Sequence, residues 1–217
     1  IPDADVVEAL VEIGANVKAA SKNGFSPLVF AVTRNSVPSI KALVAAGADP
    51  NQPLASGSFP LVVAMSYRHT GASLALLEGG ANVDTRDRAG NAPLHVAAQQ
   101  GDLEVVKALL VKRVDPNVRT PRSTAAAGAR GGGGGFRPAA SGEQTPLMMA
   151  ARGDHEDVMR ALIAAGADPS LRAQDGANVV MAAAGGARLK TLTYAYELDP
   201  DVTVVTAPAL NTVMHVV

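Results

Sequence analysis

Residues 90–117 read GNAPLHVAAQQGDLEVVKALLVKRVDPN, and parts of this pattern return along the chain at a fixed distance. The dipeptide Pro-Leu stands at 27–28, 60–61 and 93–94, so the interval is the same both times. It stands again at 146–147, one such period and an insertion later, and Asn178-Val179-Val180 follows after one more period without the Pro. Self-similarity at such a period indicates a protein built from stacked repeats.

A second marker, Gly-Ala followed by Asn or Asp, keeps the same period. It is intact at 14–16, 47–49, 80–82 and 166–168, and degraded at Arg113-Val114-Asp115 and at Glu197-Leu198-Asp199. Because two independent markers agree in phase, the repeat is not a chance match.

Each Pro-Leu marker predicts the start of a first helix. Proline costs no hydrogen bond in the first helical turn, and the preceding Ser26 or Thr145 can cap that turn. Eight residues after the four prolines stand Asn35, Arg68, Gly101 and Asp154. Three of these four residue types tolerate the left-handed conformation, so the first helix is expected to end there.

A second helix is predicted after each of these turns. Val105, Val106, Leu109 and Leu110 form an apolar stripe at helical spacing in one unit. Gly47, Gly80 and Gly166 then close the second helix in three units. Each unit is therefore expected to be a helix, a turn, a second helix and a hairpin loop.

With its Pro-Leu-His-Val-Ala core at residues 93–97, the chain resembles the ankyrin-repeat family, whose repeat carries the motif Thr-Pro-Leu-His-x-Ala at the same period. The resemblance implies an all-α solenoid of stacked helix-turn-helix units joined by hairpin loops. The expected units are 1–22 (partial), 23–55, 56–88, 89–121, 142–174, 175–208 (degenerate) and 209–217 (partial). Both ends cut through a repeat, so we expect a fragment of a longer ankyrin-repeat protein.

Residues 122–141 form an insertion rich in Gly, Ala and Arg, which we expect to be a flexible loop. It adds Arg122, Arg130, Arg137 and Phe136 to the nearby Arg119, so it is either a solvated linker or a contact arm for an acidic partner. The glycines are not a phosphate-binding loop, because Gly135 is followed by Phe136-Arg137 and not by Lys-Ser or Lys-Thr.

Composition argues against several function classes. A net charge of −1 and a pI near 6.5 give no general attraction to nucleic acid or to membranes. There is no Cys, no apolar run of the roughly 20 residues that span a bilayer, and no signal peptide, so we expect a soluble chain of unknown compartment. No two of the four histidines have metal-ligand spacing, and His95, His155 and His215 are interpreted as structural. We expect no catalytic residues, cofactor, metal or small-molecule substrate.

The resemblance implies that a protein partner is bound in the concave groove, by residues flanking the turn glycine and by the end of the first helix. Aromatic and Arg side chains dominate interface energetics, so Phe25, Arg34 and Tyr67 are the main candidates, although their variation between units also fits neutral drift. The candidates at the mapped positions are Phe25, Thr33, Arg34, Ser66, Tyr67, Arg88, Asn91, Gln99, Gln100 and Arg152, with Ser58, Gln144 and Ala177 as further ones.

The predicted function is therefore that of a non-catalytic scaffold for protein–protein interaction. The alternative is a spacer or regulatory segment of a larger enzyme or redox protein, whose catalytic domain lies outside this chain. The truncated repeats at both ends motivate that alternative.

Overall fold

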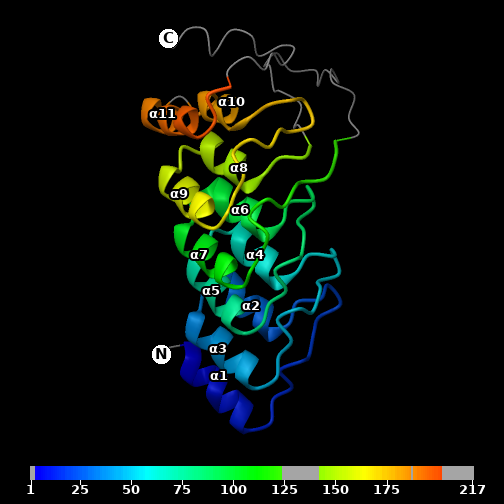
Figure 1. The fold of residues 1–217 in the computed structure, drawn as a ribbon. Coiled ribbons are helices and arrows are strands. Elements are labelled where there is room, and N and C mark those ends of the chain that lie inside the picture. Colours follow the sequence, from blue (N-terminus) through cyan, green and yellow to red (C-terminus); the bar gives the residue numbers. More distant parts are fainter. Residues whose placement is uncertain (1–2, 124–141, 187, 202–217) are drawn as a thin grey trace. The chain divides into compact units, whose positions relative to one another are not determined.

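The computed structural model describes residues 3–123, 142–186 and 188–201 (Figure 1). Within these ranges the chain forms helices and turns and no strand. The predicted flexible insertion, apart from its first two residues, and the partial last unit with His215 lie outside the described residues. The expected all-α class is confirmed.

The chain divides into two compact units, each described by itself. The first comprises Ile1–Pro93 with Lys107–Val114, and the second Leu94–Val106 with Asp115–Val217. Unit 1 holds α1 (Asp3–Glu12), α2 (Pro27–Thr33), α3 (Val37–Ala45), α4 (Pro60–Ser66) and α5 (Thr70–Glu78). Unit 2 holds α8 (Pro146–Arg152), α9 (Glu156–Ala164), α10 (Val179–Ala184) and α11 (Leu189–Leu198). Of the helices between, α6 (Pro93–Gln100) lies almost wholly in unit 2, and the division passes through α7 (Leu103–Val111).

The first helices begin where the sequence predicts. Helices α2, α4, α6 and α8 each start at the proline of a Pro-Leu marker. The Oγ of Ser26 accepts a hydrogen bond from the Val29 amide at 3.4 Å, and Oγ1 of Thr145 accepts one from the Met148 amide at 3.3 Å. Helix α10 has no proline, and Asn178 caps it instead by accepting from the Met181 amide at 3.0 Å.

The first helices also end where predicted. Asn35, Arg68, Gly101 and Asp154 have φ angles of 53°, 56°, 74° and 60°. This left-handed turn reverses the chain between the two helices of each pair. Arg68 adopts it although its side chain makes the conformation unfavourable. The degraded marker Arg113-Val114-Asp115, at the end of α7, also makes a left-handed turn. Its Arg113 has a φ of 61°.

The core of each unit is built from aliphatic and very small side chains. In unit 1, α2 packs against α3 and α4, while α3 packs against α1 and α5. Leu28, Ile40 and Leu76 are fully buried there, and Ala64 and Ala72 lie between the helices without exposed surface. In unit 2, α8 packs against α9 and α10. Short side chains let helix axes approach closely, which explains the scarcity of aromatic residues.

Asparagine side chains link successive hairpin loops within each unit. In unit 1, Nδ2 of Asn51 donates to the Gly80 carbonyl at 3.1 Å, and Oδ1 accepts from the Asn82 amide at 2.7 Å. In unit 2, Asn117 makes the same pair of bonds to Gly166 and Asp168, at 3.1 and 2.7 Å. Each asparagine satisfies a carbonyl and an amide that the loop itself leaves open.

The insertion leaves from and returns to the tip of one hairpin. The Thr120 amide donates to the Gln144 carbonyl at 3.0 Å, just as Ser21 donates to Phe25 in the first hairpin. Next to this pair, the side chain of Gln174 accepts from the Ser123 amide at 2.7 Å and donates to the Ser123 carbonyl at 3.0 Å. The Gln174 amide also donates to the Gly142 carbonyl, so one residue of the next hairpin anchors both ends of the insertion.

The end of α11 departs from the expected pattern. The marker proposed at Glu197-Leu198-Asp199 predicts a turn there, but α11 continues through Leu198 and Asp199 is extended, with a φ of −147°. No glycine is available at this point to form the left-handed turn. Asp199 instead accepts hydrogen bonds from Arg172 at 2.7 Å and from Asn178 at 3.1 Å.

Candidate functional site

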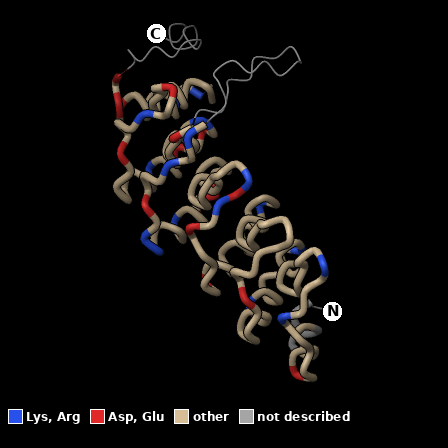
Figure 2. Tube along the Cα trace, turned by 90° about the vertical axis from the view of Figure 1, so that its right-hand side faces the viewer, with Lys and Arg blue, Asp and Glu red and all other residues tan. Residues whose placement is uncertain are grey.

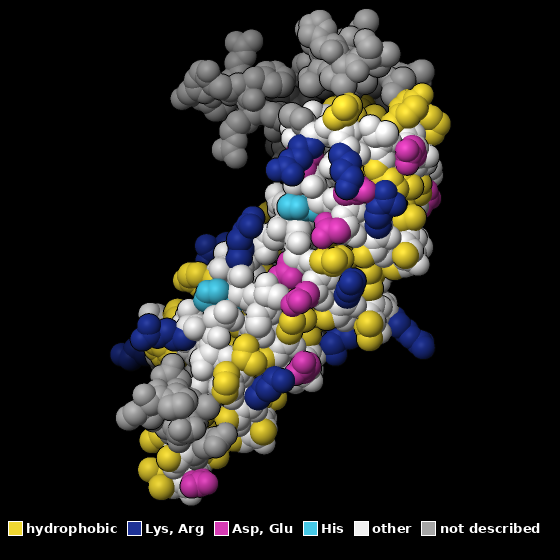
Figure 3. Space-filling view, turned by 90° about the vertical axis from the view of Figure 1, so that its left-hand side faces the viewer, with side chains coloured by type: hydrophobic (Ala, Val, Ile, Leu, Met, Phe, Trp, Pro, Cys, Tyr) yellow, Lys and Arg dark blue, Asp and Glu magenta, His cyan; other side chains and the backbone are white. Residues whose placement is uncertain are grey.

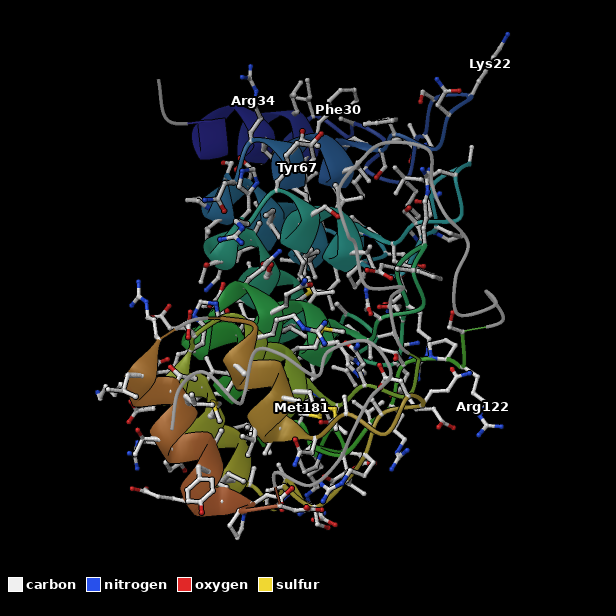
Figure 4. All side chains as sticks on the ribbon, turned by 90° about the horizontal axis from the view of Figure 1, so that it is seen from above. Lys22, Phe30, Arg34, Tyr67, Arg122 and Met181 are labelled. Carbon is white, nitrogen blue, oxygen red and sulfur yellow. The ribbon has the colours of Figure 1, made fainter. Side chains whose placement is uncertain are left out.

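Unit 1 carries a group of exposed aromatic side chains, here called the aromatic cluster: Phe25, Phe30 and Tyr67. Phe30 and Tyr67 expose 59% and 60% of their surface, and Phe25 exposes 36%. Phe25 and Phe30 have ring centroids 5.6 Å apart at an interplanar angle of 47°. Figure 4 shows Phe30 and Tyr67 on the same side of unit 1, together with Arg34. Large exposed aromatic groups are a feature of binding surfaces.

The turn before α2 positions Phe25. The Ser21 amide donates to the Phe25 carbonyl at 2.9 Å, and the Phe25 amide donates to Oγ of Ser21 at 3.1 Å. Phe30 follows on α2, and Arg34 comes four residues after it, one helical turn further on the same face. The surface along α2 thus runs from Phe25, just before the helix, through Phe30 to Arg34 at its end.

Tyr67 takes the position of Arg34 one repeat later, at the end of α4. Its ring stacks on His69, with centroids 5.5 Å apart. A ring nitrogen of His69, Nδ1, lies 3.0 Å from the Val32 carbonyl at the end of α2. Since α2 packs against α4, this contact holds Tyr67 beside the edge formed by Phe30 and Arg34.

Thr33 and Ser66 belong to the same surface, but their hydroxyl groups already serve the helices. Oγ1 of Thr33 donates to the Phe30 carbonyl at 2.8 Å, and Oγ of Ser66 donates to the Val62 carbonyl at 2.7 Å. Ser58, in the turn before α4, is half-buried. The hydroxyl hydrogens of Thr33 and Ser66 are therefore already used within their own helices.

Two predicted residues lie in the third hairpin of the sequence, near the end of unit 1. Arg88 is exposed at its tip. Asn91 is half-buried and tied to the turn, because its Nδ2 donates to Oδ2 of Asp87 at 2.9 Å and its amide donates to Oδ1 at 2.8 Å. Arg88 is therefore accessible, whereas Asn91 mainly stabilises its own turn.

The other predicted residues lie in unit 2 and are described there by themselves. Gln99 and Arg152 are exposed, and Gln100 and Ala177 are half-buried. Gln144 is only 4% exposed, and its Oε1 accepts a hydrogen bond from Arg152 at 3.0 Å. Desolvation of the Arg152 guanidinium lowers its pKa, and the nearby Asp175 partly opposes this shift. Gln144 positions Arg152 and is not itself part of an open surface.

Phe30 is the residue of this surface that the sequence interpretation missed. The equivalent positions one, two and three units later hold Val63, Val96 and Met149, which is the pattern of a core position. Met149 is indeed only 7% exposed, but Phe30 is not covered. The spacing of four residues to Arg34 is the signal that could have identified it.

The polar run Asp154-His155-Glu156-Asp157 holds the helices of unit 2 together. Nε2 of His155 lies 3.2 Å from the Gln99 carbonyl. Glu156 forms ion pairs with Arg160 at 2.8 Å and Lys190 at 3.1 Å, and its hydrogen bonds to these two residues lower its pKa. On the side where the second helices lie, Figure 3 shows acidic and basic side chains interspersed among apolar ones. These contacts give the run a structural role, in line with the interpretation of His155.

His95 is likewise engaged within the fold. It has no exposed surface, and its Nε2 lies 3.0 Å from the Gln144 carbonyl in the following hairpin. Among the residues that the structure describes, no three His, Asp or Glu side chains are grouped so that they could hold a metal ion. Over the same residues, every helix is too short or too polar to cross a bilayer.

Comparison with known proteins agrees with this architecture. A family model for ankyrin repeats (3 copies) matches residues 40–120, and a model for the single ankyrin repeat matches residues 23–53 and 142–174. These matches together cover more than half of the sequence. The chain belongs to the ankyrin-repeat family.

A solved structure shows the same fold. The crystal structure of the human ASB11 ankyrin repeat domain matches with a TM-score of 0.71 and 22% sequence identity, over 95% of this chain and 87% of that one. No curated protein matched the sequence. Ankyrin repeats are generally modules for protein–protein interaction and typically have no catalytic role.

Proposed function

We propose that this chain binds a protein partner through the surface of unit 1 formed by Phe25, Phe30, Thr33, Arg34, Ser66 and Tyr67, here called the cluster surface. The observation that carries the proposal is the exposure of Phe30 on α2 and of Tyr67 at the end of α4, two helices that pack against each other (Figure 4). Neither ring is needed to fill the core. Burying such rings against a partner would release water from a large apolar area.

Contacts within unit 1 also fix parts of the cluster surface. Phe25 is held by two hydrogen bonds to Ser21, and Tyr67 is held by stacking on His69. An ordered surface loses little conformational entropy on docking, so a few anchors suffice for useful affinity. Arg34, one turn from Phe30, adds a charged anchor of the type most common in binding hot spots.

A triple variant, Phe25→Ala, Arg34→Ala and Tyr67→Ala, tests this proposal. We expect proteins captured by the parent chain to be lost or strongly reduced with the variant, as measured by affinity capture with quantitative mass spectrometry. The matched control is Arg188→Ala, Leu189→Ala and Tyr196→Ala, which removes one Arg, one large aliphatic group and one Tyr from exposed positions in unit 2. Equal capture by the parent and the first variant would show that the cluster surface is not the binding site.

A further inference from the structure

The sequence segment that carries the cluster surface has many more basic than acidic residues. Between residues 13 and 77 the only acidic residue is Asp49, whereas the basic residues there are Lys18, Lys22, Arg34, Lys41 and Arg68. Asp49 lies in a hairpin loop, where its Oδ1 accepts from the Asn51 amide at 2.8 Å. This segment therefore carries a net positive charge, and most of the chain trace is uncharged (Figure 2).

Two of these basic groups adjoin residues of the aromatic cluster in the sequence, and both are exposed. Arg34 is one turn from Phe30, and Arg68 directly follows Tyr67. Both side chains are exposed, and within the described part of the chain neither forms an ion pair or a side-chain hydrogen bond. Lys41, in contrast, is paired with Glu78 at 2.8 Å on the second helices.

We infer that the partner segment is an acidic peptide with at least one aromatic or large aliphatic side chain. This inference rests on the proposed function and names the chemistry of its partner. Arg34 and Arg68 each offer a guanidinium that binds a carboxylate through two parallel hydrogen bonds. The apolar side chain of the peptide packs between Phe30 and Tyr67, and excludes water from those ion pairs.

Single-stranded nucleic acid also combines negative charge with flat rings, but the cluster surface fits it less well. Such strands are held by a groove of basic groups that follows several successive phosphates, with bases stacked on open aromatic faces. Here only two arginines adjoin the cluster, and the ring of Tyr67 is already stacked on His69. An acidic peptide with one apolar side chain needs only two guanidinium groups and an exposed apolar surface, and the cluster surface with Arg68 offers both.

The probe is a library of short random peptides displayed on phage and selected against the full chain. We expect the selected peptides to be net acidic and to contain Phe, Trp, Leu, Ile or Met. A selected peptide should bind about tenfold more weakly to the Phe30→Ala variant, which is about 1.4 kcal/mol of binding free energy. Its binding should also weaken with added salt, and an oligothymidylate should not displace it.

A charge-reversed variant, Arg34→Glu with Arg68→Glu, gives the sharpest comparison. A new selection against it should yield net basic peptides that still contain an apolar side chain. The matched control is Lys107→Glu with Lys112→Glu, which changes net charge equally at exposed positions on and after α7. The control should still select acidic peptides. If reversal impairs folding by circular dichroism, Arg34→Gln with Arg68→Gln should still abolish the acidic preference.

The possible outcomes separate the two proposals. Neutral or basic peptides selected by the parent, or acidic peptides that bind both arginine variants as well as the parent, would overturn the inference. If those peptides nevertheless lose binding to the triple alanine variant, the proposed function stands. Displacement by the oligothymidylate would indicate a nucleic-acid partner and overturn both proposals. Selection of no peptide, or of peptides insensitive to every variant at the cluster surface, would also overturn both.

Discussion

Arg68 occupies a backbone conformation that suits glycine better than any residue with a side chain. Its φ of 56° lies in the left-handed region, where a Cβ atom costs roughly 1–2 kcal/mol. The glycine at the equivalent position of the next repeat, Gly101, meets the same requirement without that cost. Arg68 therefore lowers the stability of this turn relative to glycine.

The first prediction is that Arg68→Gly stabilises the fold by about 0.5–1 kcal/mol, because relief of backbone strain exceeds the added flexibility of the unfolded chain. The measurement is the urea midpoint of the transition followed by circular dichroism. Arg34→Gly is the matched control. Its φ of −94° is already favourable for arginine, so this change should lower stability by about the same amount. Stabilisation by both substitutions would contradict the argument.

The second prediction concerns Gly101, where a side chain meets a histidine. A Cβ atom there would lie 2.4 Å from Nδ1 of His155, in addition to the strain of a φ of 74°. Gly101→Ala should therefore destabilise the fold by about 2 kcal/mol or more. Gly166→Ala, with a φ of 94° and open space around the new Cβ, should cost only about 1 kcal/mol. Equal losses in thermal unfolding would show that His155 is not packed against this turn.

At the scale of elements, the hairpin that carries the insertion depends on its neighbour. Gln174 makes two side-chain hydrogen bonds to the backbone of Ser123, and Gly142 has no room for a Cβ because the Ser123 amide nitrogen would be 2.3 Å away. The third prediction is that Gln174→Ala speeds hydrogen exchange at Ser123 and lowers stability by about 1 kcal/mol. Gln99→Ala removes an exposed glutamine without such bonds and should leave the exchange at Ser123 unchanged.

The fourth prediction is a pH dependence of the contact between α9 and α11. Hydrogen bonds from Arg160 and Lys190 lower the pKa of Glu156 in the folded chain. The stabilisation is therefore fully present above the unfolded-state pKa of about 4.3 and is lost as pH falls through the lower folded-state pKa. Glu156→Gln should destabilise the chain at neutral pH, and its difference from the parent should shrink and then vanish as the pH falls through the lowered folded-state pKa.

Urea midpoints of the parent and of Glu156→Gln across this pH range provide the measurement. Glu104→Gln, on the first turn of α7, is the control because Glu104 has no ion pair within the described residues. A difference between the parent and Glu156→Gln that stays constant down to acid pH would rule out the ion pairs as its cause.

At the scale of the whole molecule, the sequence predicted the helices better than the surface. Helix starts at proline and helix ends at Asn35, Gly101 and Asp154 follow from backbone chemistry that acts within a few residues, whereas the end at Arg68 follows from the repeat period. Those features are local, so a single sequence is enough to read them.

The exposure of Phe30 and the burial of Gln144 depend instead on what packs against them. Phe30 occupies a position that holds apolar residues in every full repeat, and only the structure shows that more than half of its surface is exposed. Gln144 follows the insertion, and it is buried in a site where it bonds to Thr120 and His95, both distant from it in the sequence. The extended Asp199 was missed for a similar reason, since Arg172 and Asn178 hold it from outside its own element.

The last prediction concerns the order in which the repeats open. A repeat is stabilised mainly by itself and by its immediate neighbours, so the least stable repeats can open without the others. In 56–88 neither helix has a side-chain cap, and Arg68 is strained. In 175–208, α10 has only six residues and is followed by Gly185 and Gly186. We expect hydrogen exchange to be fastest in α4, α5 and α10, and slower in α8 and α9.

Two substitutions at the end of α10 make this expectation specific. Gly185 has helical angles, φ −70° and ψ −22°, so Gly185→Ala should slow exchange in α10 by stiffening the unfolded chain, without changing α4. At Gly186 a Cβ would lie 2.8 Å from the carboxylate carbon of Asp154, so Gly186→Ala should speed exchange in α10. Uniform protection across all helices, or a parallel response of α4 and α10 to either change, would mean that the chain opens as one cooperative body and not repeat by repeat.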